Sequence, residues 1–258
     1  MLYSDIYKFG SSVKFVEKTG YGALYNWYAV DESTANGGFI NGFTVPTDAQ
    51  FTALTDLLGG EVVAGGKLRS TRTDPDLQPR WDDPNVATDE VNFSALPGGF
   101  RHTNGTYNSI GGSGFWWSST EDSATNAWRR YLRYFSGDVL RYHYSKGLGY
   151  SVRCVRPLDI NEQALDDGTY LNSVKDYYGN TYQVVKIGDL AWTAQDLRTT
   201  HYADGTPIPN VTDNAAWGEL TTGAYAWYDN DIETAGIVYS DEQIILQKAK
   251  LKARRYYL

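Results

Sequence analysis

Apolar residues recur along this chain at two spacings, and each spacing predicts a different kind of element. One segment has helical spacing, set by Phe51, Leu54, Leu57 and Leu58. Thr47, with Gln50 three positions later, is the sequence signature of a capping box at the start of a helix. Gly59-Gly60 follows the last apolar residue and is typical of a helix end. We therefore predict a helix between Thr47 and Gly59, followed by a second short helix over residues 64–68.

Elsewhere the apolar residues form short runs between clusters of Gly, Asn and Asp, which is typical of strands joined by turns. These runs predict strands at 93–100, 128–135, 139–144, 150–156, 180–187 and 190–197. The expected turns are Ser136-Gly137, Lys146-Gly147 and Gly188-Asp189. The spacing of the apolar residues therefore predicts a mainly β fold with one or two helices.

The patterning also divides the chain into segments. They are a polar-aromatic lead (1–20), a first β-rich block (21–157), a polar linker (158–177), a second β-rich block (178–231) and a basic tail (232–258). From Asp241 onwards the tail has an apolar side and five basic residues, which predicts a helix. That helix either docks onto a partner subunit or stays solvated.

Composition narrows the class of protein. Hydrophobic residues make up 41% of the 258 residues, enough for a sizeable core, and the net charge of −8 argues against general nucleic-acid binding. Cys154 is the only cysteine, which excludes an intrachain disulfide, and its alternating apolar surroundings indicate a small core residue. No apolar stretch approaches the roughly 20 residues of a membrane span, and the N-terminus lacks the pattern of a signal peptide. We therefore expect no membrane insertion.

One stretch reverses the acidic balance of the chain. Residues 121–156 hold seven basic residues against three acidic ones. Between Trp128 and Tyr150, seven aromatic residues are interleaved with Arg, Ser and Gly. Rigid amphipathic rings, Arg side chains and adaptable small polar residues together form the composition of a binding surface. The alternative is a surface β-meander that is merely rich in tyrosine.

Motifs on both sides of this stretch carry a resemblance to a known family. Trp-Trp-Ser-Ser-Thr-Glu at 116–121 and Ser-Val-Arg-Cys-Val-Arg at 151–156 bracket it. With the segments 21–28, 43–49, 65–68 and 96–100, they resemble the later parts of the Fibrobacter succinogenes major paralogous domain. The segments 179–197, 202–210 and 223–231 resemble the opening of that domain.

The resemblance has implications for both fold and function. It implies an α+β, C-type lectin-like fold of mainly antiparallel strands with one or two helices. The chain is also similar to variable proteins of diversity-generating retroelements, some of them carried by bacteriophages. In those proteins a hypervariable window lies between the two bracketing motifs, which corresponds to residues 122–150 here.

The order of the motifs departs from the family, because the block that resembles its beginning follows the block that resembles its end. The chain therefore resembles a circularly permuted member. In C-type lectin folds the first and last strands lie together, so the strand near 151–156 is expected to pair with 180–187 of the same chain. The linker of about 20 residues is long enough for that return. The alternative is a swap, in which 178–231 completes a neighbouring subunit.

These observations predict a binding protein that needs neither catalysis nor a cofactor. The expected ligand-binding residues are Asn126, Arg129, Arg130, Tyr131, Arg133, Phe135, Leu140, Tyr142, His143, Tyr144, Leu148 and Tyr150. The expected scaffold residues beside them are Trp128, Leu132, Val139 and Val152. The resemblance implies a phage receptor-binding or adhesion role, with a protein or glycan receptor on a target cell surface as the partner. The expected location is the phage tail, or alternatively the bacterial surface, and assembly with further copies or with tail proteins stays open.

Three other functions stay open at this point. A calcium-dependent carbohydrate-binding lectin needs converging oxygen ligands, for which the candidates are Asp83-Pro84-Asn85, Ile208-Pro209-Asn210 and Asp229-Asn230-Asp231. The fold also resembles that of formylglycine-generating enzymes, but these need a pair of cysteines and the chain has one. A nucleic-acid surface of stacked tyrosines is the last alternative, and the acidic charge of the whole chain opposes it.

Overall fold

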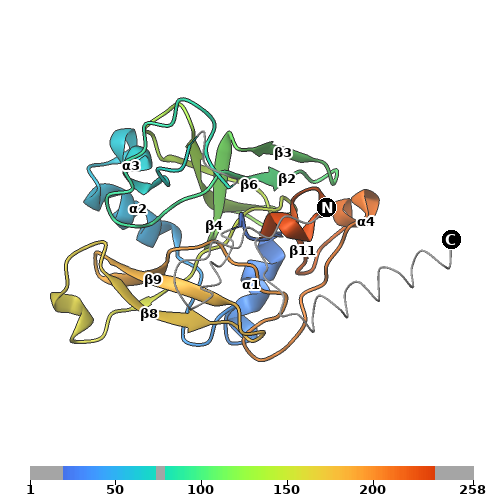
Figure 1. Ribbon diagram of the computed structural model, residues 1–258. Helices are drawn as coiled ribbons and strands as arrows, with labels where there is room; N and C mark the ends of the chain where they lie inside the picture. The colour runs from blue at the N-terminus through green and yellow to red at the C-terminus, as the bar shows by residue number, and fades with distance from the viewer. Residues whose placement is uncertain (1–19, 74–78, 236–258) are drawn as a thin grey trace, which may run out of the picture.

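The computed structural model describes residues 20–73 and 79–235, whose arrangement is shown in Figure 1. The predicted lead, apart from its last residue, and the predicted C-terminal helix lie outside these ranges. The α-helices of the described residues are α1 (Trp27–Ala35), α2 (Asp48–Leu57), α3 (Glu61–Leu68) and α4 (Asn214–Gly218). Short 3-10 helices are η1 (Glu162–Ala164), η2 (Tyr228–Asn230) and η3 (Ile232–Ala235).

The strands of the described residues form three sheets. The five-stranded sheet has the order β3 (Tyr107–Ile110), β2 (Gly98–Arg101), β4 (Ser113–Glu121), β5 (Asn126–Arg133) and β6 (Leu140–Ser145). The four-stranded sheet has the order β7 (Val155–Pro157), β10 (Leu190–Thr193), β9 (Thr181–Ile187) and β8 (Tyr170–Lys175). A small sheet joins β1 (Leu24–Tyr25) to β11 (Tyr225–Ala226). The strand pairs are antiparallel except for β2 with β4, so the predicted mainly antiparallel α+β architecture is confirmed.

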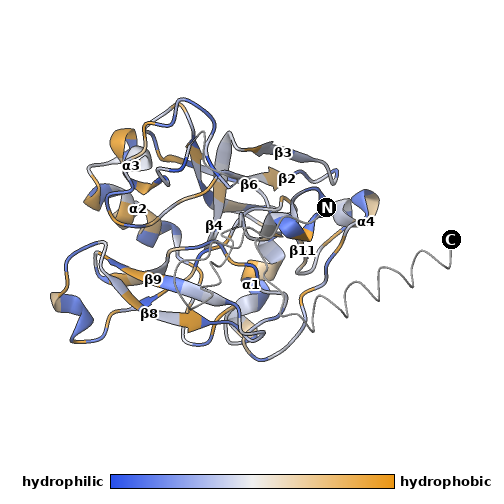
Figure 2. Cartoon of the chain, viewed as in Figure 1, coloured by the Kyte–Doolittle hydropathy of each residue, from blue (hydrophilic) through white to orange (hydrophobic). Residues whose placement is uncertain are grey.

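The helix predicted from the capping box is confirmed as α2. Gln50 N donates to Thr47 Oγ1 at 3.1 Å, and Thr47 N donates to Gln50 Oε1 at 2.8 Å. Phe51 and Leu54 are buried, so the helix packs one face against the core. Figure 2 shows hydrophobic residues recurring along α2 and along α3, which begins at Glu61 rather than at residue 64.

The sequence pattern did not indicate α1, because four apolar residues (27–30) are followed by four polar ones (31–34) and the segment has no amphipathic period. Its start is fixed by the buried Asn26, whose Oδ1 accepts from Ala29 N at 3.1 Å. The same oxygen accepts from Ala224 N at 3.0 Å, and Asn26 Nδ2 donates to the carbonyl oxygen of Thr222 at 2.8 Å. The helix therefore begins where the first block is tied to the second block, a contact between residues far apart in the sequence.

The two β-rich blocks share one core. β1 pairs with β11, and β7 pairs with β10. The predicted pairing of 151–156 with 180–187 is corrected in its detail, because β10 lies between β7 and β9. Part of the predicted linker is the strand β8, which pairs with β9. Its side chains are mostly exposed, so β8 lacks the apolar alternation by which a strand is recognised.

Three predicted strands are shorter in the structure, and one of them is the run 190–197, which forms a strand only over Leu190–Thr193. The run 93–100 forms a strand only from Gly98, because Ser94 has a positive φ of 51° that interrupts it. The run 150–156 contributes isolated bridges and then the short strand β7. Among the described residues, no helix has the length and apolar character needed to cross a membrane.

Buried polar groups also join the blocks. The side chains of Arg153 and Asp196 are fully buried and form an ion pair, with Nε and Oδ1 2.6 Å apart. Trp116 Nε1 donates to the same carboxylate oxygen at 2.8 Å. Cys154, next to Arg153, is fully buried, as its alternating surroundings predicted.

Candidate functional site

The pairing of β5 with β6 sorts the predicted ligand-binding residues onto two faces. Residues opposite each other in an antiparallel pair point to the same side of the sheet. Arg129 lies opposite Tyr142, and Tyr131 lies opposite Leu140. We call this side the tyrosine face, and its members are Arg129, Tyr131, Arg133, Leu140, Tyr142 and Tyr144.

The tyrosine face presents two rings to solvent above a packed base. Tyr142 and Tyr144 are 50% and 49% exposed. Beneath the face, Phe115 of β4 stacks on Tyr131, with ring centroids 4.5 Å apart, and on Tyr150, with centroids 5.2 Å apart. Tyr150 is only 2% exposed, so it supports the face from the core.

Leu148, another predicted ligand-binding residue, is likewise in the core and 5% exposed. The predicted scaffold residues Leu132, Val139 and Val152 are buried as well. Fewer residues are therefore exposed to a ligand than the sequence predicted.

Arg129 lies at the centre of the tyrosine face and is 5% exposed. Its Cζ atom is 4.6 Å from the ring centre of Tyr144 and 4.9 Å from that of Phe115. The rings of Tyr131, Tyr142 and Tyr150 lie within 5.8 Å of the same atom. Its Nε and Nη1 have no hydrogen-bond acceptor among the described residues. The guanidinium is thus enclosed by aromatic rings rather than by acceptors.

The opposite face of the β5–β6 ribbon packs against α2. Arg130 Nη1 donates to Asp48 Oδ1 at 2.5 Å, and its Nη2 donates to Thr52 Oγ1 at 2.8 Å. Arg141 binds the same carboxylate, with Nη2 2.8 Å from Oδ2. Burial disfavours the charged carboxylate of Asp48, but the hydrogen bonds from Arg141 and Arg130 outweigh burial and lower its pKa. Arg130 therefore secures the ribbon to the helix.

Two more predicted ligand-binding residues, Asn126 and His143, lie on this second face. His143 Nδ1 is 3.2 Å from Asp122 Oδ2, and its ring packs edge-to-face with Trp128, with 5.2 Å between the ring centroids. Trp128 in turn carries the Arg141 guanidinium 3.6 Å above its ring. Since the two faces of a sheet point in opposite directions, Asn126, Arg130 and His143 do not join Tyr142 and Tyr144 in one surface.

Phe135 extends the tyrosine face at the turn between β5 and β6. It is 56% exposed, and the Arg133 guanidinium lies 4.9 Å from its ring centre and 5.8 Å from that of Tyr131. The turn is held from below by the buried Arg69, which donates to the carbonyl oxygens of Arg133 and Ser136. Burial lowers the pKa of Arg69 to about 10.

The cysteine and the segments considered as calcium ligands lie outside the tyrosine face. Burial raises the pKa of the Cys154 thiol, which is unfavourable for a nucleophile. Asn85 Nδ2, in the Asp83-Pro84-Asn85 segment, donates to the carbonyl oxygen of Ser70 at 2.9 Å, while its buried Oδ1 accepts no hydrogen bond from the described residues. Asn230 Oδ1 accepts from the Tyr107 hydroxyl at 2.7 Å. Across residues 20–73 and 79–235, no three His, Cys, Asp or Glu side chains gather as metal ligands.

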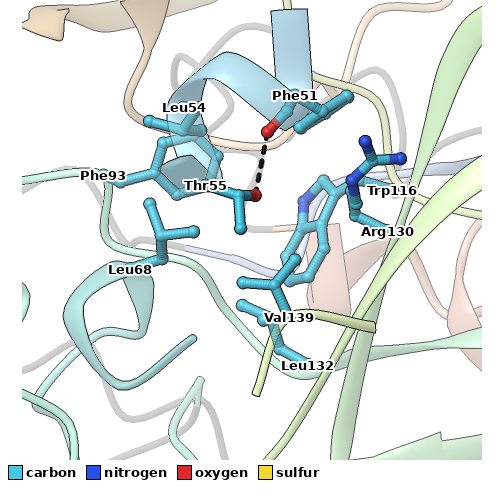
Figure 3. A pocket seen from close by; sticks show the side chains of 9 residues that line it. All are labelled: Phe51, Leu54, Thr55, Leu68, Phe93, Trp116, Arg130, Leu132 and Val139. Atoms are coloured by element: carbon cyan, nitrogen blue, oxygen red, sulfur yellow. Dashed lines mark hydrogen bonds between the residues drawn. The ribbon is translucent and has the colours of Figure 1, made fainter. Parts of the chain in front are cut away.

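Figure 3 shows a gap in the apolar core between α2, α3 and the five-stranded sheet. It is lined by Phe51, Leu54, Thr55, Leu68, Phe93, Trp116, Arg130, Leu132 and Val139. The Thr55 hydroxyl points back to the carbonyl oxygen of Phe51 at 2.8 Å and leaves the lining apolar. With a volume of about 10 Å³, the gap has room for about one water molecule, so it is a packing defect rather than a ligand site.

Two residues that build the site were missed at the sequence level. Phe115 precedes the Trp116-Trp117 pair, and alternation along that strand places it on the same face as Trp117. A strict period of two would have identified it. Asp48 carries no such signal, because its arginine partners lie more than 80 positions away in the sequence.

Comparisons with known proteins give one finding. The family model described as Fibrobacter succinogenes major domain matches residues 10–156, which is more than half of the 258 residues. Neither the curated proteins nor the solved structures gave a match.

Proposed function

Because the chain belongs to the Fibrobacter succinogenes major domain family, we propose that it is a ligand-binding protein whose tyrosine face recognises a receptor on a target cell surface. The observation that carries this proposal is the pair of half-exposed rings, Tyr142 and Tyr144, in neighbouring outward positions of one strand. Large apolar rings in such positions add little to folding stability and present contact area to a partner.

The physical character of the face suits recognition. A tyrosine ring supplies a large contact at low entropic cost, because it has few rotatable bonds, and its hydroxyl supplies a hydrogen bond. The rings stand on strands that pack against the core through Phe115, so they are held in place before a ligand arrives. Arg129 adds positive charge to the same face, whose strands β5 and β6 contain no Asp or Glu, and Arg133 is paired with Asp138 of the intervening turn.

The proposal extends to the scaffold and its origin. The scaffold is a circularly permuted, C-type lectin-like fold, and the pairings β1–β11 and β7–β10 support this by joining the two blocks of one chain. Residues 122–150 are the variable window of a retroelement-diversified protein. They include both strands of the exposed ribbon, while Phe115 and Trp117 beneath it lie outside the window.

The biological setting is a phage tail or another host-attachment structure, with bacterial-surface display as the alternative, and no catalytic step is involved. A near-copy of the codons for 122–150 beside a reverse-transcriptase gene, differing at adenines, is the expected genomic signature. A locus without such a copy would remove the diversification part of the proposal.

The binding function is tested by a paired-variant experiment. Fluorescently labelled protein is incubated with a panel of bacterial cells, and bound protein is measured by flow cytometry. Tyr142→Ala with Tyr144→Ala should abolish attachment while leaving the melting temperature nearly unchanged. The control is Tyr177→Ala with Tyr178→Ala, which removes two rings of similar exposure, 59% and 61%, outside the window. Equal attachment by both double variants and the unchanged protein would refute the tyrosine face as the binding site.

A further inference from the structure

Arg129 and Arg130 are neighbours in β5, yet their side chains have opposite surroundings. Both are almost fully buried, at 5% and 3% exposed. Arg130 is neutralised by Asp48, with 2.5 Å between Nη1 and Oδ1. Arg129 Nε and Nη1 are buried and have no acceptor in the part of the chain that the structure describes. The contrast shows that the fold supplies a counter-ion for one arginine and only rings for the other.

Aromatic rings compensate a guanidinium only in part. Their faces attract the positive charge, and five rings surround Arg129 within 5.8 Å. A ring face is nevertheless a weak hydrogen-bond acceptor, so the buried N–H groups stay unsatisfied. Unsatisfied donors of this kind destabilise a fold unless a water molecule, an ion or a ligand accepts a hydrogen bond from them.

The rings around Arg129 are not equally fixed. Phe115 and Tyr150 are buried at 6% and 2% exposure, whereas Tyr142 and Tyr144 are about half exposed. A group approaching the tyrosine face therefore meets Arg129 on the side of Tyr142 and Tyr144. These two rings have solvent beside them into which they can turn.

We propose that Arg129 anchors a carboxylate group of the ligand, a specification that rests on the proposed binding function. The planar guanidinium matches a carboxylate, which accepts two parallel N–H groups. A phosphate, with its higher charge, favours a cluster of free cations, but the neighbouring Arg133 already faces Asp138 at 3.6 Å. The carboxylate belongs to an acidic sugar or to an acidic side chain of a protein receptor.

If Arg129 has this role, substitutions of Arg129 and Arg130 should have different effects on stability. Arg129→Met removes unsatisfied donors while keeping much of the apolar volume, so stability should be unchanged or raised. Arg130→Met leaves the Asp48 carboxylate with Arg141, which is partly exposed, as its remaining ion-pair partner, so stability should fall. A purely structural role for Arg129 predicts that its replacement destabilises the protein as Arg130→Met does.

The direct test follows the Arg129 Nε–Hε resonance by NMR in the full-length protein during titration. One arm compares N-acetylneuraminic acid with its methyl ester, and the other compares acetylated, amidated glutamate with the glutamine counterpart. We expect at least one carboxylate probe to shift the resonance. Its affinity should exceed that of its neutral counterpart about tenfold or more, the size expected for a charge-assisted hydrogen-bonded pair. The arm that responds identifies the source of the carboxylate.

Three results would overturn the carboxylate anchor: equal binding of the neutral probes, no shift with either acid, or unchanged binding by Arg129→Met. Cell attachment separates this failure from failure of the binding function itself. If Arg129→Met attaches normally while Tyr142→Ala with Tyr144→Ala does not, the anchor is refuted and the binding function stands. If both variants attach normally, the binding function is refuted as well.

Discussion

The ring of Phe115 lies parallel to the ring of Tyr131, with 4.5 Å between the centroids and 3° between the planes. Phe115 is buried, and its other stacking partner is the buried Tyr150. Tyr131 itself is only partly buried and belongs to the tyrosine face. The stack therefore holds Tyr131, and with it the proposed binding surface, against the core.

Replacing Phe115 by leucine tests this connection. Phe115→Leu keeps an apolar side chain but removes both stacks, so we expect the free energy of unfolding to fall by about 1–2 kcal/mol. Cell attachment should weaken as well, because Tyr131 loses the surface that holds it. Urea unfolding and flow cytometry measure the two effects.

The control for this substitution is Phe100→Leu. Phe100 packs edge-on against Phe115 and Tyr150, whereas the ring that stacks on Tyr131 is that of Phe115. It should lower stability with little effect on attachment. If Phe115→Leu attaches as well as Phe100→Leu, the stack does not support binding.

The lowered pKa of Asp48 predicts how the free energy of unfolding depends on pH in the acidic range. Its folded-state pKa is lowered from 3.8. A group with a lowered folded-state pKa stabilises the protein above its unfolded-state pKa, and this stabilisation is lost as the pH falls through the folded-state pKa. The stability difference between the unchanged protein and Asp48→Asn should therefore be full near neutral pH and shrink below about pH 4.

Urea midpoints measured from pH 7 down to pH 2 give this difference directly. Asp56→Asn is the matched control, because Asp56 lies exposed on the same helix. Its substitution should give a smaller difference at neutral pH. A pH-independent difference for Asp48→Asn would show that the charge of Asp48 does not contribute to the stability of the protein.

The extent to which sequence predicts this fold differs from helix to helix. The signals for α2 are local, since Thr47, Gln50 and the apolar spacing all lie within a dozen residues. α1 depends instead on Asn26, whose partners Thr222 and Ala224 come from the other end of the described chain. Local patterns predict elements that local interactions stabilise, and they fail where distant contacts decide.

The same distinction holds for the candidate site. The tyrosine- and arginine-rich composition pointed to the β5–β6 ribbon, but composition does not say which face each residue occupies. The register does so, and it separates Arg130 from Arg129 although they are adjacent in sequence. Composition also places Tyr150 with the exposed tyrosines, because nothing in its immediate sequence indicates that Phe115 stacks on it.

Because the two blocks share one core, neither is expected to fold without the other. A fragment of residues 1–164 leaves Arg153 without Asp196, β7 without β10 and β1 without β11. A buried arginine that loses the carboxylate with which it forms an ion pair costs about 3–5 kcal/mol, which is comparable to the whole stability of a modest domain. We therefore expect this fragment to be unfolded alone, and to fold when the fragment 165–258 is added in equal amount.

Near-UV circular dichroism and two-dimensional amide NMR measure that recovery. The control is the full-length chain with a protease site inserted between Ala164 and Leu165, at exposed or partly exposed residues. Cleavage there should leave the spectrum unchanged, because the two blocks stay in contact through the core. Cooperative folding of 1–164 alone, at full stability, would contradict the shared core. A dimer of the intact chain that exchanges subunits on dilution would indicate that 178–231 completes a neighbouring copy instead.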